Sequence, residues 1–187
     1  NTIYYYQGNL QIPDAVDYDD VQILAGTTED ETTTSGAGTI IVDGNVILSG
    51  NMAYETPTTP LDDIIKIPSL GWIIRGDLTI NPLVSNLVGA FLVLGCPGDE
   101  SVTTCDSLNQ GTVNQGTVHT GYSLDLPLVV KGLIMARSIV FERNIVGNLG
   151  AQGSEQVIYD GRFIANPPPG LQDLSAAVPS LRLDVPQ

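Results

Sequence analysis

Side chains able to do acid–base chemistry are scarce in this chain. Its one histidine, His119, lies in the segment VHTGY. General acid–base catalysis most often uses histidine, and a Ser-His-Asp triad would have to use this one. No serine is surrounded by the glycines of a nucleophile elbow. A lone histidine in a loop is more often structural or solvated, so we predict that His119 is not catalytic.

Carboxylate pairs could act on polysaccharides, because glycoside hydrolysis needs two carboxylates that face each other across a groove. The acids near apolar segments are Asp43, Asp77, Glu142 and Asp160, and their basic neighbours are Arg75, Lys131, Arg137 and Arg143. These residues do not form a close-set acidic cluster, and we expect them to face outward as a ladder of surface charge. The sequence therefore predicts a protein that is not an enzyme, with no catalytic and no cofactor-binding residues.

An acidic run offers the carboxylates that a divalent cation could use. Asp17, Asp19 and Asp20 lie within DAVDYDD, but the run lacks the spaced carboxylates and fixed glycine of a calcium loop. We predict no cofactor, and we keep calcium at these three aspartates as an open alternative.

The two cysteines, Cys96 and Cys105, bracket the polar segment CPGDESVTTC. A metal site would need more ligands, and no histidine is close by in the sequence. We therefore predict a disulfide between them. Disulfides persist in oxidising compartments, so this prediction places the protein outside the cell or on the cell surface.

Charge and composition exclude several partners. The chain of 187 residues has 21 acidic and 7 basic residues and a formal net charge of −14. A surface of this charge repels nucleic-acid phosphates and anionic membranes. The chain also lacks a run of about twenty apolar residues, so we expect neither nucleic-acid binding nor membrane insertion.

The elements that carry these residues repeat. A nine-residue frame with a central glycine occurs four times, as IIVDGNVIL (40–48), WIIRGDLTI (72–80), LVVKGLIMA (128–136) and VIYDGRFIA (157–165). Apolar residues alternate in each copy, which is typical of a strand with one buried face. The charged residues before the glycines predict cross-strand pairs of Asp43 with Arg75 and of Lys131 with Asp160, on exposed positions.

Repeats of a few short strands, with glycine and asparagine at the corners, predict an all-β fold in which successive coils pair in parallel as a β-solenoid. A β-sandwich or jelly roll with a donated N-terminal strand is the alternative, because alternation does not distinguish parallel from antiparallel sheets. We divide the chain into an N-terminal strand arm with an acidic Thr/Gly-rich linker (1–38) and a solenoid body with a C-terminal cap (39–187). The apolar segment 83–94 predicts a strand that is buried on both faces.

The N-terminal arm is the predicted assembly element. Its segment NTIYYYQGNLQI could pair with a sheet edge of another copy or fold back on its own body, and the sequence leaves both open. The assembly candidates are Ile3, Tyr4, Tyr5, Tyr6, Leu10 and Ile12.

Four segments carry a family resemblance: GTIIVDGNVILSGNMAY, PSLGWIIRGDLTINPLVSNLVGAFLVLG, LVVKGLIMARSIVFERNIVG and EQVIYDGRFIANPPPGL. Together they resemble the β-helical C-terminal surface domains of uncharacterised envelope proteins from candidate-phyla bacteria, which are distantly bactofilin-like. The resemblance covers residues 36–187. It implies a right-handed parallel β-helix on an extracellular or envelope protein and carries over no site residues.

The sequence thus favours an extracellular structural protein that assembles with copies of itself as a filament or surface-layer subunit. One alternative is a carbohydrate-binding or carbohydrate-cleaving β-helix, which would take surface glycans as partners. Another is an adhesin module that uses the cysteine loop and the tandem NQGTV loop as its contact surface.

Overall fold

A computed structural model describes residues 2–12, 21–29, 32–56, 61–96, 115–144 and 153–173 of the chain. These residues form mostly strands, with one short helix, α1 (Arg162–Ala165), and one 3₁₀ turn, η1 (Ile64–Lys66). The prediction of an all-β protein is therefore confirmed.

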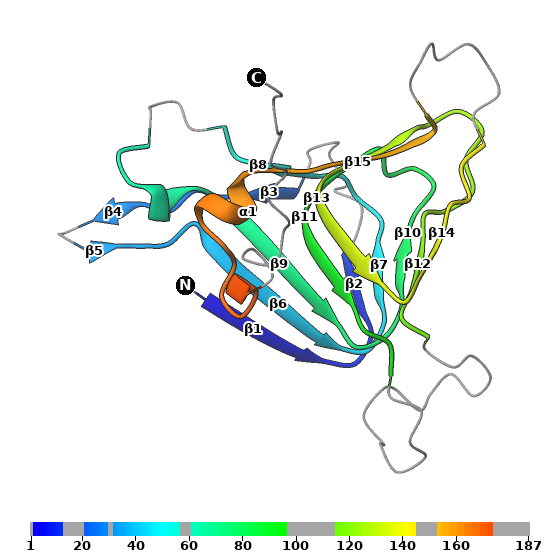
Figure 1. The fold of residues 1–187 in the computed structure, drawn as a ribbon, viewed down its shortest axis with the longest axis horizontal. Helices are drawn as coiled ribbons and strands as arrows, with labels where there is room; N and C mark the ends of the chain where they lie inside the picture. Colours follow the sequence, from blue (N-terminus) through cyan, green and yellow to red (C-terminus); the bar gives the residue numbers. More distant parts are fainter. Residues whose placement is uncertain are drawn as a thin grey trace, which may run out of the picture.

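Two parallel sheets dominate the molecule (Figure 1). The six-stranded sheet has the order β1 (Thr2–Gln7), β6 (Ala37–Asp43), β9 (Ser69–Ile74), β11 (Asn86–Val93), β13 (Leu128–Ala136), β15 (Glu155–Ile158). The five-stranded sheet has the order β14 (Ser138–Val140), β12 (Thr117–His119), β10 (Leu78–Ile80), β7 (Val46–Leu48), β2 (Leu10–Ile12). Consecutive strands therefore alternate between the sheets, as β1 then β2, β6 then β7, and β9 then β10.

Two small pairs complete the described strands. β3 (Val21–Ile23) pairs with β8 (Met52–Tyr54) in parallel, whereas β4 (Thr28–Glu29) and β5 (Thr32–Thr33) form a short antiparallel hairpin. Both large sheets are parallel throughout, which differs from the antiparallel pairing of the sandwich alternative.

The first two copies of the nine-residue frame each fold as two strands around a corner. Gly44 separates β6 from β7, and Gly76 separates β9 from β10. The predicted alternation holds on both sides of the corner, because the apolar residues before and after the glycine all pack in the core. They are Ile40, Val42, Val46 and Leu48 in the first copy, and Trp72, Ile74, Leu78 and Ile80 in the second.

The third and fourth copies depart from the prediction. β13 runs straight through Gly132, which lies opposite Gly89 in β11 and has a φ of +152°. The fourth copy is a strand only up to Ile158, after which the chain turns into α1. The alternation of apolar residues in the nine-residue frame is the same in all four copies. It therefore did not show that the last part of the fourth copy forms a helix instead of a strand.

The core lies between the sheets. Trp72 in β9 stacks on Phe91 in β11, with ring centroids 6.2 Å apart and planes inclined by 10°. Both rings are 1% exposed, and residues of β7, β10 and β12 pack into the same cluster. Burying such aromatic side chains is among the largest single contributions to stability, at roughly 1.5–3 kcal/mol each.

The other face of the six-stranded sheet is covered as well. Phe163 of α1 and Leu171 pack on Ala90, with Ile73 and Leu92 beside them. A Cβ on Gly71 would lie 2.5 Å from Leu171 Cδ1 and 2.9 Å from Pro168 Cβ, so a larger residue here would displace these side chains from the sheet. β11 is therefore buried on both faces, as segment 83–94 predicted.

A ladder of polar side chains holds the corner between the sheets. The backbone N–H of Asn45 donates to Asn9 Oδ1 at 2.9 Å, that of Asp77 donates to Asn45 Oδ1 at 2.8 Å, and that of Thr117 donates to Asp77 Oδ1 at 2.8 Å. Each rung of the ladder supplies one orphan N–H with an acceptor. The ladder includes Asn9, so it ties the N-terminal strands to the rest; the predicted boundary after residue 38 falls inside β6.

Candidate assembly surfaces

β1 forms one edge of the six-stranded sheet. It pairs in parallel with β6 from Thr2 opposite Gly38 to Gln7 opposite Asp43, so the arm folds back on its own body. The described part of the chain places no strand on its other side (Figure 1). An open edge of this kind is a template for a further strand.

The six predicted assembly residues divide into two groups. Ile3, Tyr4, Tyr5 and Tyr6 are 53, 62, 62 and 44% exposed along β1. Leu10 and Ile12 are half-buried in β2, where they pack against the core, although β2 is itself the edge of the five-stranded sheet. The structure thus leaves one aromatic edge strand open to solvent.

Tyr5 anchors this strand to the next one. Its hydroxyl donates to Asp43 Oδ2 at 3.1 Å, and Arg75 Nη1 lies 3.2 Å from Asp43 Oδ1. Partial desolvation and then the hydrogen bond to Asp43 raise the pKa of Tyr5. The contact ties an edge strand that would otherwise be held by its backbone alone.

The predicted pair of Asp43 with Arg75 is confirmed, but it is not exposed. The Asp43 side chain is 2% exposed and that of Arg75 is 34% exposed. The predicted pair of Lys131 with Asp160 is wrong, because Lys131 lies opposite Ile158 and Asp160 instead binds Arg162 at 2.9 Å. The chain leaves β15 before Asp160 reaches the register of Lys131.

The opposite end of the stack carries the other two edges. β15 is the last strand of the six-stranded sheet, and β14 is the last strand of the five-stranded sheet. Val157, Ile158 and Tyr159 are 50, 46 and 44% exposed there, and Phe141, just after β14, is 62% exposed. Within the described residues, both ends therefore combine a parallel edge that no further strand covers with exposed apolar side chains.

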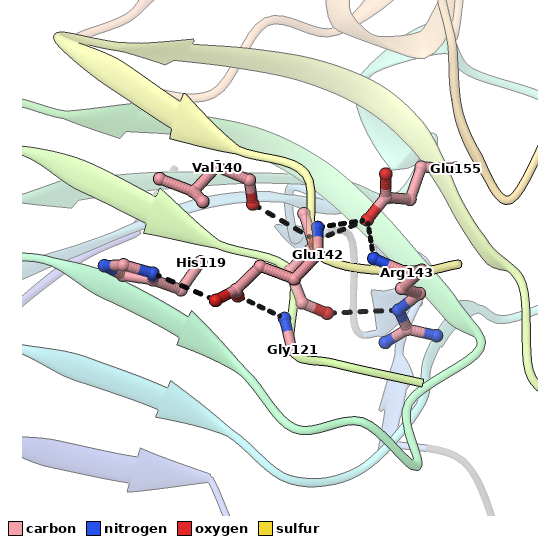
Figure 2. A network of polar contacts seen from close by, with 7 residues as sticks. His119, Gly121, Val140, Glu142, Arg143 and Glu155 are labelled. Carbon is pink, nitrogen blue, oxygen red and sulfur yellow. Dashed lines mark hydrogen bonds and ion pairs between the residues drawn. The ribbon is translucent and has the colours of Figure 1, made fainter. Parts of the chain in front are cut away.

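A polar network braces the corner beside β14 (Figure 2). Glu155 Oε1 accepts the N–H groups of Glu142 and Arg143 at 3.1 Å each and also the hydroxyl of Thr120. Glu142 Oε2 accepts the N–H of Gly121 at 3.0 Å. These carboxylates hold backbone amides and join three segments of the chain.

Arg143 completes this network from a buried position. It is 5% exposed and donates to the carbonyl oxygens of Thr120 and Leu126 at 3.0 Å and of Asn81 at 3.2 Å. Burial lowers its pKa, which the charge of Glu155 partly opposes. The expectation that Arg143 faces outward is wrong, and nothing in the sequence around it indicated burial.

His119 lies at the margin of the network. Its Nδ1 is 3.7 Å from Glu142 Oε1, which is too long for a hydrogen bond, and its side chain is 42% exposed. The geometry suits bracing of a corner, and the prediction that His119 has no catalytic role stays a prediction.

Two sequence predictions fall on parts of the chain without a described structure. Asp17, Asp19 and Asp20 lie outside the described residues, as does Cys105, so the calcium alternative and the disulfide of Cys96 stay predictions. Within the described ranges, no group of three or more His, Cys, Asp or Glu side chains could hold a metal ion. No helix in these ranges is long and apolar enough to cross a membrane.

Comparison of the chain with protein-family models, with curated proteins and with solved structures finds no match. The resemblance to bacterial surface domains consequently stays an expectation from the four quoted segments. The function has to be argued from the geometry of the two ends.

Proposed function

We propose that this chain is a non-enzymatic structural protein, outside the cell or on its surface, that associates with copies of itself end to end as a filament or surface-layer subunit. The observation that carries the proposal is the pair of open parallel edges. β1 with its tyrosines ends one side of the six-stranded sheet, and β15 with Val157 and Ile158 ends the other. Exposed apolar groups of this extent usually mark interaction surfaces.

The alternation of strands supports a coiled architecture as part of this proposal. Each passage of the chain through the two sheets adds one strand to each of them, in the same direction as the strand before. An arrangement of this kind supports a parallel β-helix, which would be right-handed by the general rule for parallel crossovers. A β-helix ends in unpaired rungs unless something caps them.

The two ends differ, which determines how copies would join. One end presents β1 and β2, and the other presents β15 and β14. A contact between unlike ends is heterologous and can continue indefinitely, whereas a contact between like ends closes at two copies. Addition of β1 to β15 in parallel would extend the six-stranded sheet at its normal strand spacing of roughly 4.8 Å.

A hollow beside β1 supports docking at the first end. It has a volume of about 360 Å³ and is lined by Tyr4, Ile23 and Leu70 among other residues. It gives an apolar side chain from another copy a place to be buried. The net charge of −14 opposes association of free copies, so we expect assembly to be favoured by added salt.

Sedimentation velocity and negative-stain microscopy test the proposal with the variant Tyr4→Lys/Tyr6→Lys. Two lysines on an edge strand block pairing with another chain. We expect polymers of the wild type at 150 mM salt and a monomer for the variant. Leu83→Lys is the matched control, because Leu83 is 68% exposed in a turn between the sheets, away from both ends. A wild type that stays monomeric at every concentration, or equal polymers of the double variant, would contradict the proposal.

A further inference from the structure

A second surface feature lies at the carboxyl ends of three strands of the six-stranded sheet. A cavity of about 530 Å³ opens there beside β9, β11 and the part of β13 that follows its pairing with β15. Its lining includes Leu92, Leu94 and Met135 with Arg75 and Arg137. Ligand pockets commonly have volumes of 300–1,000 Å³ and combine apolar walls with a few polar groups.

The register of the sheet sets the order of the side chains. Ile74 is opposite Val93, and Val93 is opposite Ala136. The next residues along the three strands are Arg75, Leu94 and Arg137, so Leu94 holds the backbone position between the two arginines. Two rungs separate the arginines, which is roughly 10 Å at the normal spacing of strands.

The charge of this site is opposite to that of the molecule. Asp43 is bound to Arg75 on one oxygen and to Tyr5 on the other, so Asp43, Arg75 and Arg137 together carry one net positive charge. Among the described residues no carboxylate forms a salt bridge with Arg137, which is exposed. The described charged residues at this site thus carry one net positive charge, in a chain whose formal net charge is −14.

We propose that this cavity binds a short aliphatic carboxylic acid as its anion. A planar guanidinium matches a carboxylate with two parallel hydrogen bonds, and a net charge of +1 matches a monoanion better than a dianionic phosphate ester. Leu92, Leu94 and Met135 form the surface on which the alkyl chain lies. Among the described residues that line the cavity, none has an aromatic ring on which a sugar could stack.

Titration calorimetry with acetate, butyrate, hexanoate and hexylamine tests this site on the full chain. We expect affinity to rise about fourfold for each CH₂ added, until the apolar surface is covered. Hexylamine has the same alkyl chain with the opposite charge, and it should not bind measurably.

Arg137→Gln is expected to weaken hexanoate binding about tenfold or more, since a charge-assisted hydrogen-bonded pair is lost. Lys131→Gln is the matched control: Lys131 is an exposed cation on the same strand but does not line the cavity, so its loss should change affinity less than twofold. No heat with hexanoate, equal binding of hexylamine, or an equal loss in both variants would overturn the proposal. β9 and β11 are inner strands, whereas β13 is paired on its outer side only over Leu128–Lys131.

Discussion

Tyr54 shows how a single side chain joins the two faces of the molecule. Its hydroxyl accepts the N–H of Leu70 at 3.4 Å, and the guanidinium carbon of Arg162 lies 4.8 Å from its ring centroid. Burial raises the pKa of Tyr54 to about 12. The phenol is therefore held neutral between a core strand and the helix that covers the sheet.

This burial predicts a loss of stability at high pH. The folded pKa of about 12 exceeds the ordinary tyrosine value of 10.0, so the stabilisation is complete below pH 10 and is lost as pH rises to 12. A difference of two pKa units corresponds to roughly 2–3 kcal/mol. Urea unfolding between pH 9 and 12 should show this loss in the wild type and a shallower one in Tyr54→Phe. Identical pH profiles for the two proteins would show that Tyr54 does not titrate with folding.

A contact between two charged residues was predictable only where the sequence repeat correctly gave the register of the two strands that carry them. Asp43 and Arg75 precede corner glycines of two successive coils, so the repeat placed them side by side, and the structure agrees. Lys131 and Asp160 precede glycines that do not occupy equivalent places, because Gly132 lies within a strand and Gly161 precedes a helix. The same nine-residue frame therefore predicted one contact correctly and one wrongly.

At the scale of elements, apolar alternation identified the strands but not where they bend. The frame around Gly44 contains a corner, whereas the frame around Gly132 is continuous. At Gly44 a Cβ would lie 2.3 Å from the carbonyl oxygen of Gly8 in the preceding coil, and that contact is visible only once the coils are stacked. The sequence also did not predict the corner that Glu155 and Arg143 hold, because most of their partners are backbone groups more than ten residues away in the sequence.

The buried Arg143 predicts that one side chain stabilises this whole corner. Arg143→Met keeps the apolar stem but leaves the carbonyl groups of Thr120, Leu126 and Asn81 without their donor. An unsatisfied buried acceptor costs about 1–3 kcal/mol, and only the bond to Thr120 is fully buried, so we expect a loss of about 1–3 kcal/mol in the free energy of unfolding. Urea denaturation measures it.

The exposed Arg137→Met provides the comparison for this substitution. It removes the same charge from the neighbouring segment and should change stability by less than about 0.5 kcal/mol. Equal losses in both variants would mean that the net charge, and not the three carbonyl contacts, accounts for the effect.

At the scale of the molecule, stacking is the organising feature, and the ends are where it stops. The all-β class follows from composition and repeats, whereas the choice of parallel over antiparallel pairing and the order β1-β6-β9-β11-β13-β15 required the structure. Segment 83–94 was recognised as doubly buried, but what covers its outer face, Phe163 and Leu171, comes from a distant part of the chain. Such long-range cover leaves no local signal in sequence.

The difference between the two ends makes a complementation experiment decisive for how copies join. A first variant, Tyr4→Lys/Tyr6→Lys, blocks the β1 end, and a second, Val157→Lys/Tyr159→Lys, blocks the β15 end; all four positions are at least 44% exposed, so both variants should fold. Each variant keeps one unmodified end. Head-to-tail joining predicts that each variant alone is monomeric, because its unmodified end would have to pair with the opposite end of another copy, and that end carries the lysines. An equimolar mixture should then form dimers and stop there, as measured by light scattering after size-exclusion chromatography. Joining of like ends predicts the reverse: each variant would dimerise alone through its open end, and mixing would add nothing.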